Sequence, residues 1–134
     1  MERYGEIWLL QEFYSINDIN LLQGKYIRVT GFIELYNPMN MTCQINHKGY
    51  SLIIDFSLCG STTNISIGGL AQFIGELRDK ENIAMIGRTN PAVAKNNLRI
   101  YLKARVYRNV TGLDLDLYEQ SLLKRRKFLQ VDLW

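Results

Sequence analysis

Cysteine, proline and histidine are scarce in this sequence of 134 residues, which contains two, two and one of them. Cys43 and Cys59 are too few for a disulfide framework and match no metal-binding spacing such as C-x-x-C. We interpret both as small buried hydrophobic residues. No apolar run approaches the roughly 20 residues that cross a bilayer, and the N-terminal residues lack the basic start and apolar stretch of a signal peptide. We therefore expect a soluble protein that stays inside the cell and contacts no membrane.

Low-complexity tracts are also missing, which argues against a fibrous or disordered chain. Hydrophobic residues make up 47% of the sequence and charged residues 22%, an ordinary globular composition. A chain of this length is typical of one domain and can bury a sizeable core without disulfides or metals.

Catalytic motifs are absent as well: the sequence has no G-x-S-x-G, Walker A, H-E-x-x-H or dinucleotide-binding fingerprint. Its single histidine, His47, falls at a predicted hairpin turn, where we expect an exposed turn residue rather than a catalytic base. Asp114 and Asp116 stand at a predicted helix start, and capping explains them better than acid–base chemistry. We predict no catalytic residue, no metal ligand and no cofactor, and hence a protein that is not an enzyme.

The sequence does contain hydrophobic residues that alternate with a period of two, a pattern that predicts β-strands. We expect five strands, at residues 24–36, 39–47, 50–56, 70–78 and 97–108. Leu35 of the first strand and Val106 of the last are assigned to the inward face. Gly31 lies in the middle of the first strand at an inward position, which indicates a bulge or a sharp bend of the kind that turns a barrel corner.

Five short strands with a bent first strand favour a mainly β fold, a small five-stranded Greek-key barrel of the oligonucleotide/oligosaccharide-binding (OB) type. A β-sandwich is the structural alternative, but it usually contains about seven strands. We place the barrel at residues 24–110 of a single domain that spans 1–134. Residues 1–23 are expected to form an N-terminal arm with one turn of helix after Asp18, and residues 113–130 a C-terminal α-helix.

Basic residues concentrate at the end of the chain. Residues 1–94 contain seven Lys/Arg against nine Asp/Glu, a net charge of −2, whereas residues 95–134 contain nine against four, a net charge of +5. On the outward face of the last predicted strand, cations alternate with aromatic rings, which suits phosphate neutralisation and base stacking in single-stranded nucleic acid. A solvent-facing strand whose long side chains shield the sheet explains the pattern equally well. The candidate nucleic-acid-binding residues are Tyr26, Arg99, Tyr101, Lys103 and Arg105.

The predicted C-terminal helix is more apolar than a helix that covers its own barrel needs to be. Six large apolar or aromatic residues spread over a broad arc of it: Leu115, Leu117, Tyr118, Leu122, Phe128 and Leu129. We infer from this excess a helix-to-helix contact with another protein. The alternative is that the excess caps the bottom of the barrel.

Four short motifs follow one another along the chain: Ile-Arg-Val-Thr-Gly-Phe at 27–32, Gly-Glu-Leu at 75–77, Lys-Ala-Arg-Val at 103–106, and Gly-Leu-Asp-Leu-Asp-Leu-Tyr-Glu-Gln-Ser-Leu-Leu at 112–123. In this order they resemble the family of small Ten-one subunits of the CST telomere-capping complex. The resemblance covers about residues 24–130. The sequence departs from the family in a longer connection at 79–96 and in its N-terminal arm.

The resemblance implies a non-catalytic OB-fold subunit that pairs with a Stn-type OB subunit, their C-terminal helices packing together. It also implies a larger Ctc/Cdc-type subunit, weak or complex-dependent contact with single-stranded telomeric DNA, and a place in the nucleus at chromosome ends. The small subunit of a replication protein A-like complex and a stand-alone nucleic-acid-binding module are the alternatives. The partner-binding positions implied are Arg28, Leu115, Tyr118, Leu122, Arg125, Phe128 and Leu129.

Overall fold

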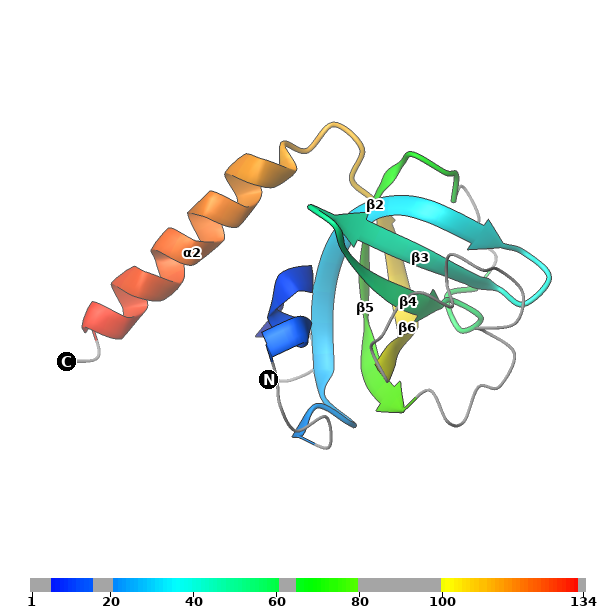
Figure 1. Cartoon of the computed structure of the whole chain (residues 1–134), viewed down its shortest axis with the longest axis horizontal. Coiled ribbons are helices and arrows are strands. Elements are labelled where there is room, and N and C mark those ends of the chain that lie inside the picture. The colour runs from blue at the N-terminus through cyan, green and yellow to red at the C-terminus, as the bar shows by residue number, and fades with distance from the viewer. Residues whose placement is uncertain (1–5, 16–20, 61–64, 80–99, 133–134) are drawn as a thin grey trace.

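The computed structural model describes residues 6–15, 21–60, 65–79 and 100–132, the last five as backbone only (Figure 1). Its elements are β1 (Glu6–Ile7), the 3-10 helix η2 (Leu10–Ser15), β2 (Tyr26–Asn37), β3 (Thr42–His47), β4 (Tyr50–Asp55), β5 (Leu70–Asp79), β6 (Ile100–Asn109) and the α-helix α2 (Leu115–Asp132). Among the described residues, no helix combines the length and the apolar character needed to cross a membrane.

Strands β2 to β6 form a closed barrel. The strand order is β2-β3-β4-β6-β5, and β5 pairs back onto β2. Within the barrel, β4 and β6 run parallel, and the other neighbours run antiparallel. This is the Greek-key connectivity of an OB fold, so the predicted five-stranded barrel with a C-terminal helix is confirmed.

Barrel closure depends on the bend of β2, whose two halves have different neighbours. Residues 26–32 pair with β5, and residues 32–37 pair with β3. Gly31 lies at this change of partner, and a Cβ there would lie 3.1 Å from both Ile45 Cβ and Leu10 Cδ1. A glycine suits this position because the bend brings β3 and η2 so close to the backbone that a Cβ would press against both. The predicted bend at Gly31 is therefore confirmed.

A β-bulge follows the bend and reverses the two faces of β2. Ile33 pairs with Ile45 while Leu35 pairs with Gln44, which leaves Glu34 as the extra residue. Leu35 consequently packs outside the main core, and Tyr36 turns inward, with its ring centroid 5.8 Å from that of Phe56. The inward assignment of Leu35 was wrong, since a single inserted residue exchanges the two faces of a strand.

A second bulge has the same effect on β6. Ile74 pairs with Val106 while Gly75 pairs with Ala104, so that Arg105 is the extra residue. Val106 is 41% exposed, and Tyr107 turns inward against Phe73, with ring centroids 5.4 Å apart. The inward assignment of Val106 was therefore also wrong.

The core contains the inward residues of all five barrel strands together with Leu10 and Phe13 of η2. Cys43 lies in this core and Cys59 packs against it; both are free thiols, and burial raises the pKa of each, that of Cys59 to about 11. The second strand begins later than predicted, since Met41 adopts a φ of 55° just before it.

One local prediction needs correction, and one falls outside the described residues. His47 was predicted to be an exposed turn residue, but it is 7% exposed because Asp116 and Glu119 of α2 lie over it. The helical turn of the N-terminal arm was predicted after Asp18, which lies outside the described residues. A separate helical turn, η2, lies earlier in the arm, and its N-terminus is capped by Glu12 Oε1, which accepts a hydrogen bond from Leu9 N at 2.7 Å.

We expect Gly75→Ala to destabilise the protein severely. A Cβ at Gly75 would lie 2.2 Å from the carbonyl oxygen of Lys103 and 2.6 Å from Ala104 Cα, and the backbone of β6 cannot yield. The free energy of unfolding, measured by urea denaturation, should fall by about 3 kcal/mol or more, at the upper end for overpacked cores. Gly31→Ala is the matched comparison and should cost less, since its closest contacts are side-chain atoms at 3.1 Å. An equal fall in the free energy of unfolding for the two variants would show that the backbone of β6 can move away from a Cβ at Gly75.

Candidate partner-binding groove

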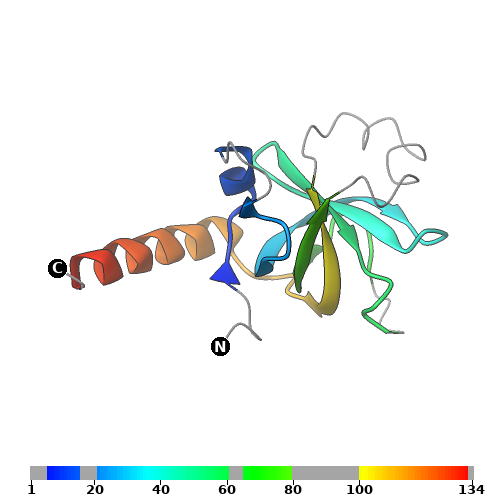
Figure 2. The same ribbon diagram turned by 90° about the horizontal axis from the view of Figure 1, so that it is seen from below.

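Helix α2 extends away from the barrel instead of lying across it (Figures 1 and 2). Asp114 caps its N-terminus: the Oδ1 atom accepts a hydrogen bond from Leu117 N at 3.1 Å. The prediction that Asp114 or Asp116 starts the helix is confirmed at Asp114. Among the described apolar side chains of α2, Leu115 at its start is buried, whereas Leu117 and Leu123 are 58% and 48% exposed. Among the described residues of the helix, its own chain therefore leaves Leu117 and Leu123 largely uncovered.

The N-terminal arm lies beside this helix and is fixed to the barrel. β1 pairs in parallel with β2, and Trp8 N donates a hydrogen bond of 2.9 Å to the carbonyl oxygen of Arg28. The indole ring of Trp8 stacks on Phe13, with centroids 5.0 Å apart, and its Nε1 donates to Glu6 Oε1 at 3.1 Å. Because backbone pairing and ring stacking both hold the arm, it forms a rigid wall facing the helix.

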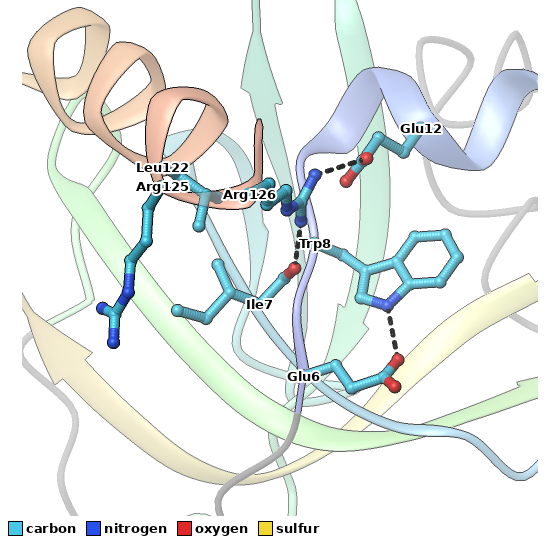
Figure 3. Close-up of a pocket in the computed structure, with 7 residues that line it drawn as sticks. All are labelled: Glu6, Ile7, Trp8, Glu12, Leu122, Arg125 and Arg126. Carbon is cyan, nitrogen blue, oxygen red and sulfur yellow. Dashed lines mark hydrogen bonds and ion pairs between the residues drawn. The ribbon is translucent and has the colours of Figure 1, made fainter. Parts of the chain in front are cut away.

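Between the arm and α2 lies a groove of about 590 Å³ (Figure 3). At the base of this groove, Arg126 joins the two walls: its Nη1 donates to Glu12 Oε2 at 2.7 Å, and its Nη2 donates to the carbonyl oxygen of Ile7. Apolar and charged side chains both line the groove. They are Glu6, Ile7, Trp8, Glu12, Leu122, Arg125 and Arg126.

The partner-binding positions implied by the resemblance are only partly brought together. Leu122 and Arg125 line the groove, and Tyr118 is half-buried one turn before Leu122. Leu115 is buried at the base of α2, and Arg28 lies half-buried on β2 beside Ile7 of β1. Phe128 and Leu129 belong to α2, where the structure describes backbone only.

Sequence reasoning missed the other wall of the groove, formed by Glu6, Ile7, Trp8 and Glu12. The segment had been assigned only as a short strand or arm. The available signal was Trp8 within the apolar run Ile7–Leu10, since a tryptophan in a terminal arm needs a surface to pack against.

The predicted nucleic-acid-binding face does not form the expected row of exposed cations and rings. Tyr101 lies on the outward face, as predicted, but it is 2% exposed and packs with Ile53 outside the main core, so its ring is not the exposed stacking surface that was expected. Arg105 is exposed at the bulge, and Tyr26 is half-buried at the start of β2. Arg99 lies outside the described residues.

Lys103, the remaining residue of that face, is engaged within the barrel. Its Nζ lies 2.8 Å from Asp55 Oδ2 and 3.3 Å from Ser57 Oγ. Burial raises the pKa of Asp55, but the hydrogen bonds from Lys103 and Ser57 outweigh burial and leave that pKa below its ordinary value. The Lys103 ammonium therefore neutralises a carboxylate of its own chain.

An OB barrel with a projecting C-terminal helix and an N-terminal arm that walls a groove defines a small binding subunit. A family model described as "Telomere-capping, CST complex subunit" matches residues 1–132. The CST complex subunit TEN1 of Arabidopsis thaliana is 30% identical over 126 residues, covering 90% of this chain and 83% of the relative. The chain belongs to the telomere-capping family of CST complex subunits.

Solved structures agree at the level of the fold. Ten1 from Saccharomyces pombe matches with a TM-score of 0.64 and 14% identity, over 92% of this chain and 98% of the other. A chain of the S. pombe Stn1–Ten1 complex matches with the same TM-score and identity, over 95% and 96%.

We expect Arg126→Met to loosen the C-terminal half of α2. The change removes the ion pair with Glu12 and the hydrogen bond to Ile7, which together tie the helix to the arm. Since partly exposed ion pairs contribute about 0.5–1 kcal/mol, amide hydrogen exchange in α2 should accelerate roughly two- to fivefold. Arg125→Met, in the neighbouring exposed arginine, is the control and should leave exchange unchanged. Equal acceleration in the two variants would show that Arg126 does not hold the helix.

Proposed function

We propose that this protein is the small OB-fold subunit of a CST-type complex and that it binds a Stn-type subunit through α2. The observation that carries the proposal is the projecting helix, whose apolar surface the barrel leaves largely uncovered. An isolated helix of this length is marginally stable in water, so a partner that covers it also stabilises it. The family to which the chain belongs consists of CST subunits, and a chain of the S. pombe Stn1–Ten1 complex has the same fold.

The groove fits an apolar helix of the partner better than it fits a small ligand. It is bounded on one side by α2, so a second helix that lies in it would pack against Leu122, Arg125 and Arg126. Leu122 and Ile7 supply the apolar contact, and Arg125 and Glu6 supply charges toward its rim. Apolar contacts combined with charged groups suit a helix-in-groove interface, and the charges of Arg126 and Glu12 at the base of the groove already neutralise each other.

The alternative in which the apolar helix caps its own barrel is disfavoured. Of the α2 side chains that the structure describes, Leu115 and Glu119 are buried, and the remaining leucines are half-buried or exposed. A helix that capped the barrel would bury a stripe along its whole length.

Direct binding of single-stranded DNA is a minor part of the proposed role. Tyr101 is buried and Lys103 is neutralised, which leaves Arg105 as the exposed cation of the predicted set within the described part of β6. The partner and a larger Ctc-type subunit would supply most of the affinity for the telomeric strand. Within such a complex the protein would act in the nucleus at chromosome ends as a non-catalytic subunit.

Leu122→Glu should abolish co-purification with the Stn-type partner. Burying a leucine at an interface contributes roughly 1.5–3 kcal/mol, and a carboxylate at the same position adds a desolvation cost. The dissociation constant, measured by titration calorimetry, should rise by more than about tenfold.

Gln120→Glu is the control for this experiment, since Gln120 is an exposed polar residue on the opposite side of α2 and does not line the groove. It should weaken the complex less than Leu122→Glu does. If the complex forms with unchanged affinity in the Leu122 variant, the assignment of the groove as the partner site is wrong.

For DNA binding, we expect Arg105→Ala in the assembled complex to reduce the salt dependence of affinity by about one phosphate contact. Tyr101→Phe should leave DNA affinity unchanged because the ring is buried. Fluorescence anisotropy with a single-stranded telomeric oligonucleotide at several salt concentrations measures both effects. If Tyr101→Phe lowers DNA affinity as much as Arg105→Ala does, Tyr101 contacts DNA as the sequence predicted.

A further inference from the structure

A histidine and two carboxylates meet where the β3–β4 hairpin touches the base of α2. His47 is the last residue of β3, directly before the turn at Lys48 and Gly49, which have φ values of 55° and 85°. Its Nε2 lies 3.4 Å from Asp116 Oδ1 and 3.3 Å from Glu119 Oε2. The three residues come from two elements far apart in the sequence.

The imidazole is buried and its hydrogen bonding is incomplete. His47 is 7% exposed, and its Nε2 makes no hydrogen bond of acceptable geometry even though both carboxylates lie close to it. A buried polar atom without a partner is rare in native proteins and calls for an explanation such as an ion. Because this nitrogen points into the carboxylate pair, the ligand it indicates is a cation.

The two carboxylates are arranged on one face of the helix. Asp116 and Glu119 are three residues apart in the first turns of α2, so their side chains project in the same direction. Glu119 is 5% exposed, and a carboxylate buried to this extent requires a compensating positive charge. One ligand atom from each of the three residues lies within 4.8 Å of the others.

We propose that His47, Asp116 and Glu119 bind a divalent transition-metal ion, with Zn²⁺ the ion that the donor set favours. Bonds of about 2.0–2.2 Å at a tetrahedral angle place two ligand atoms roughly 3.4 Å apart. The distances from His47 Nε2 to the two carboxylate oxygens have this value. One imidazole and two carboxylates make a three-ligand site, with water in the fourth position.

Lys48 competes with the metal for the same carboxylates. Its Nζ donates a hydrogen bond of 3.3 Å to Glu119 Oε1 and lies 3.6 Å from Asp116 Oδ1. Lys48 contacts Glu119 Oε1, whereas His47 faces Glu119 Oε2. The Lys48 side chain is 55% exposed, so that it can turn into solvent. The ion pair between Lys48 and Asp116 must therefore break before a metal binds, and its strength lowers the metal affinity.

Such a metal would join the barrel to the helix. His47 belongs to a barrel strand and the two acids to α2, so three bonds to one ion fix the angle at which α2 leaves the barrel. This consequence rests on the proposed function of α2, whereas metal binding itself is tested on the isolated chain without the partner.

The test is Zn²⁺ binding to the full chain with no affinity tag, since a histidine tag would mask the site. Titration calorimetry in a non-chelating buffer should give one Zn²⁺ per chain, and Co²⁺ should give the visible absorption of tetrahedral coordination. His47 is the single histidine of the sequence, so its imidazole NMR signals should shift with the same stoichiometry. Binding with no shift of these signals would overturn the proposal.

Variants separate the metal site from a simple ion pair. His47→Gln and Asp116→Asn should each lower Zn²⁺ affinity tenfold or more, and Lys48→Met should raise it because the competing ammonium is gone. Asp114→Asn is the matched control, since asparagine keeps the helix cap and Asp114 lies outside the cluster. If His47→Gln fails to fold, Asp116→Asn decides, because Asp116 is 65% exposed.

Two results would overturn the proposal: undiminished Zn²⁺ binding in Asp116→Asn, or weaker binding in Lys48→Met. Either would indicate that an imidazolium and the Lys48 ammonium neutralise the carboxylates directly.

Discussion

The bend of β2 at Gly31 is the constraint on which the rest of the structure depends. It lets one strand pair with β5 through its first half and with β3 through its second half, and this double pairing closes the barrel. The absence of a side chain at Gly31 also admits Leu10 Cδ1, so that η2 packs directly on the bend. The position of the N-terminal arm is thus a consequence of barrel closure.

The N-terminal arm and α2 form the groove because they lie side by side. β1 is held by β2, and α2 is attached near its start by Glu119 and further along by Arg126. Between these attachments the helix stands clear of the barrel and leaves the groove (Figures 2 and 3). Both attachments are polar, and polar contacts hold a helix in place without covering its apolar side chains. That combination is suited to a subunit whose helix is completed by another protein.

The same arrangement supports the proposal that the protein contributes little direct nucleic-acid contact. The bulge at Arg105 turns Tyr107 into the core, Tyr101 is buried with Ile53, and Lys103 pairs with Asp55. Several of the alternating cations and rings on this strand therefore contact other barrel residues and not solvent. A modest net charge of +3 is consistent with a subunit that relies on its partners for affinity.

Much of the fold could be predicted from local patterns. Alternation located the five barrel strands, and Gly31 marked the bend, since these features depend on neighbouring residues only. The inward and outward faces of β2 were predicted correctly up to Glu34, and those of β6 up to Arg105. Beyond these residues the two faces were exchanged in the prediction. A bulge is decided by the register between two strands, which no single strand encodes.

The sequence by itself determined the barrel class, the helix and its excess of apolar residues, because periodicity and capping act over a few residues. Only the tertiary structure decided that Trp8 and Glu12 wall the groove and that His47 lies buried against Asp116 and Glu119. These groups are far apart along the chain, and their meeting follows from barrel closure and from the direction in which α2 leaves the barrel. The single histidine, which the sequence predicted to be an exposed turn residue, therefore has a different meaning once the chain is folded: its imidazole lies where two carboxylates converge.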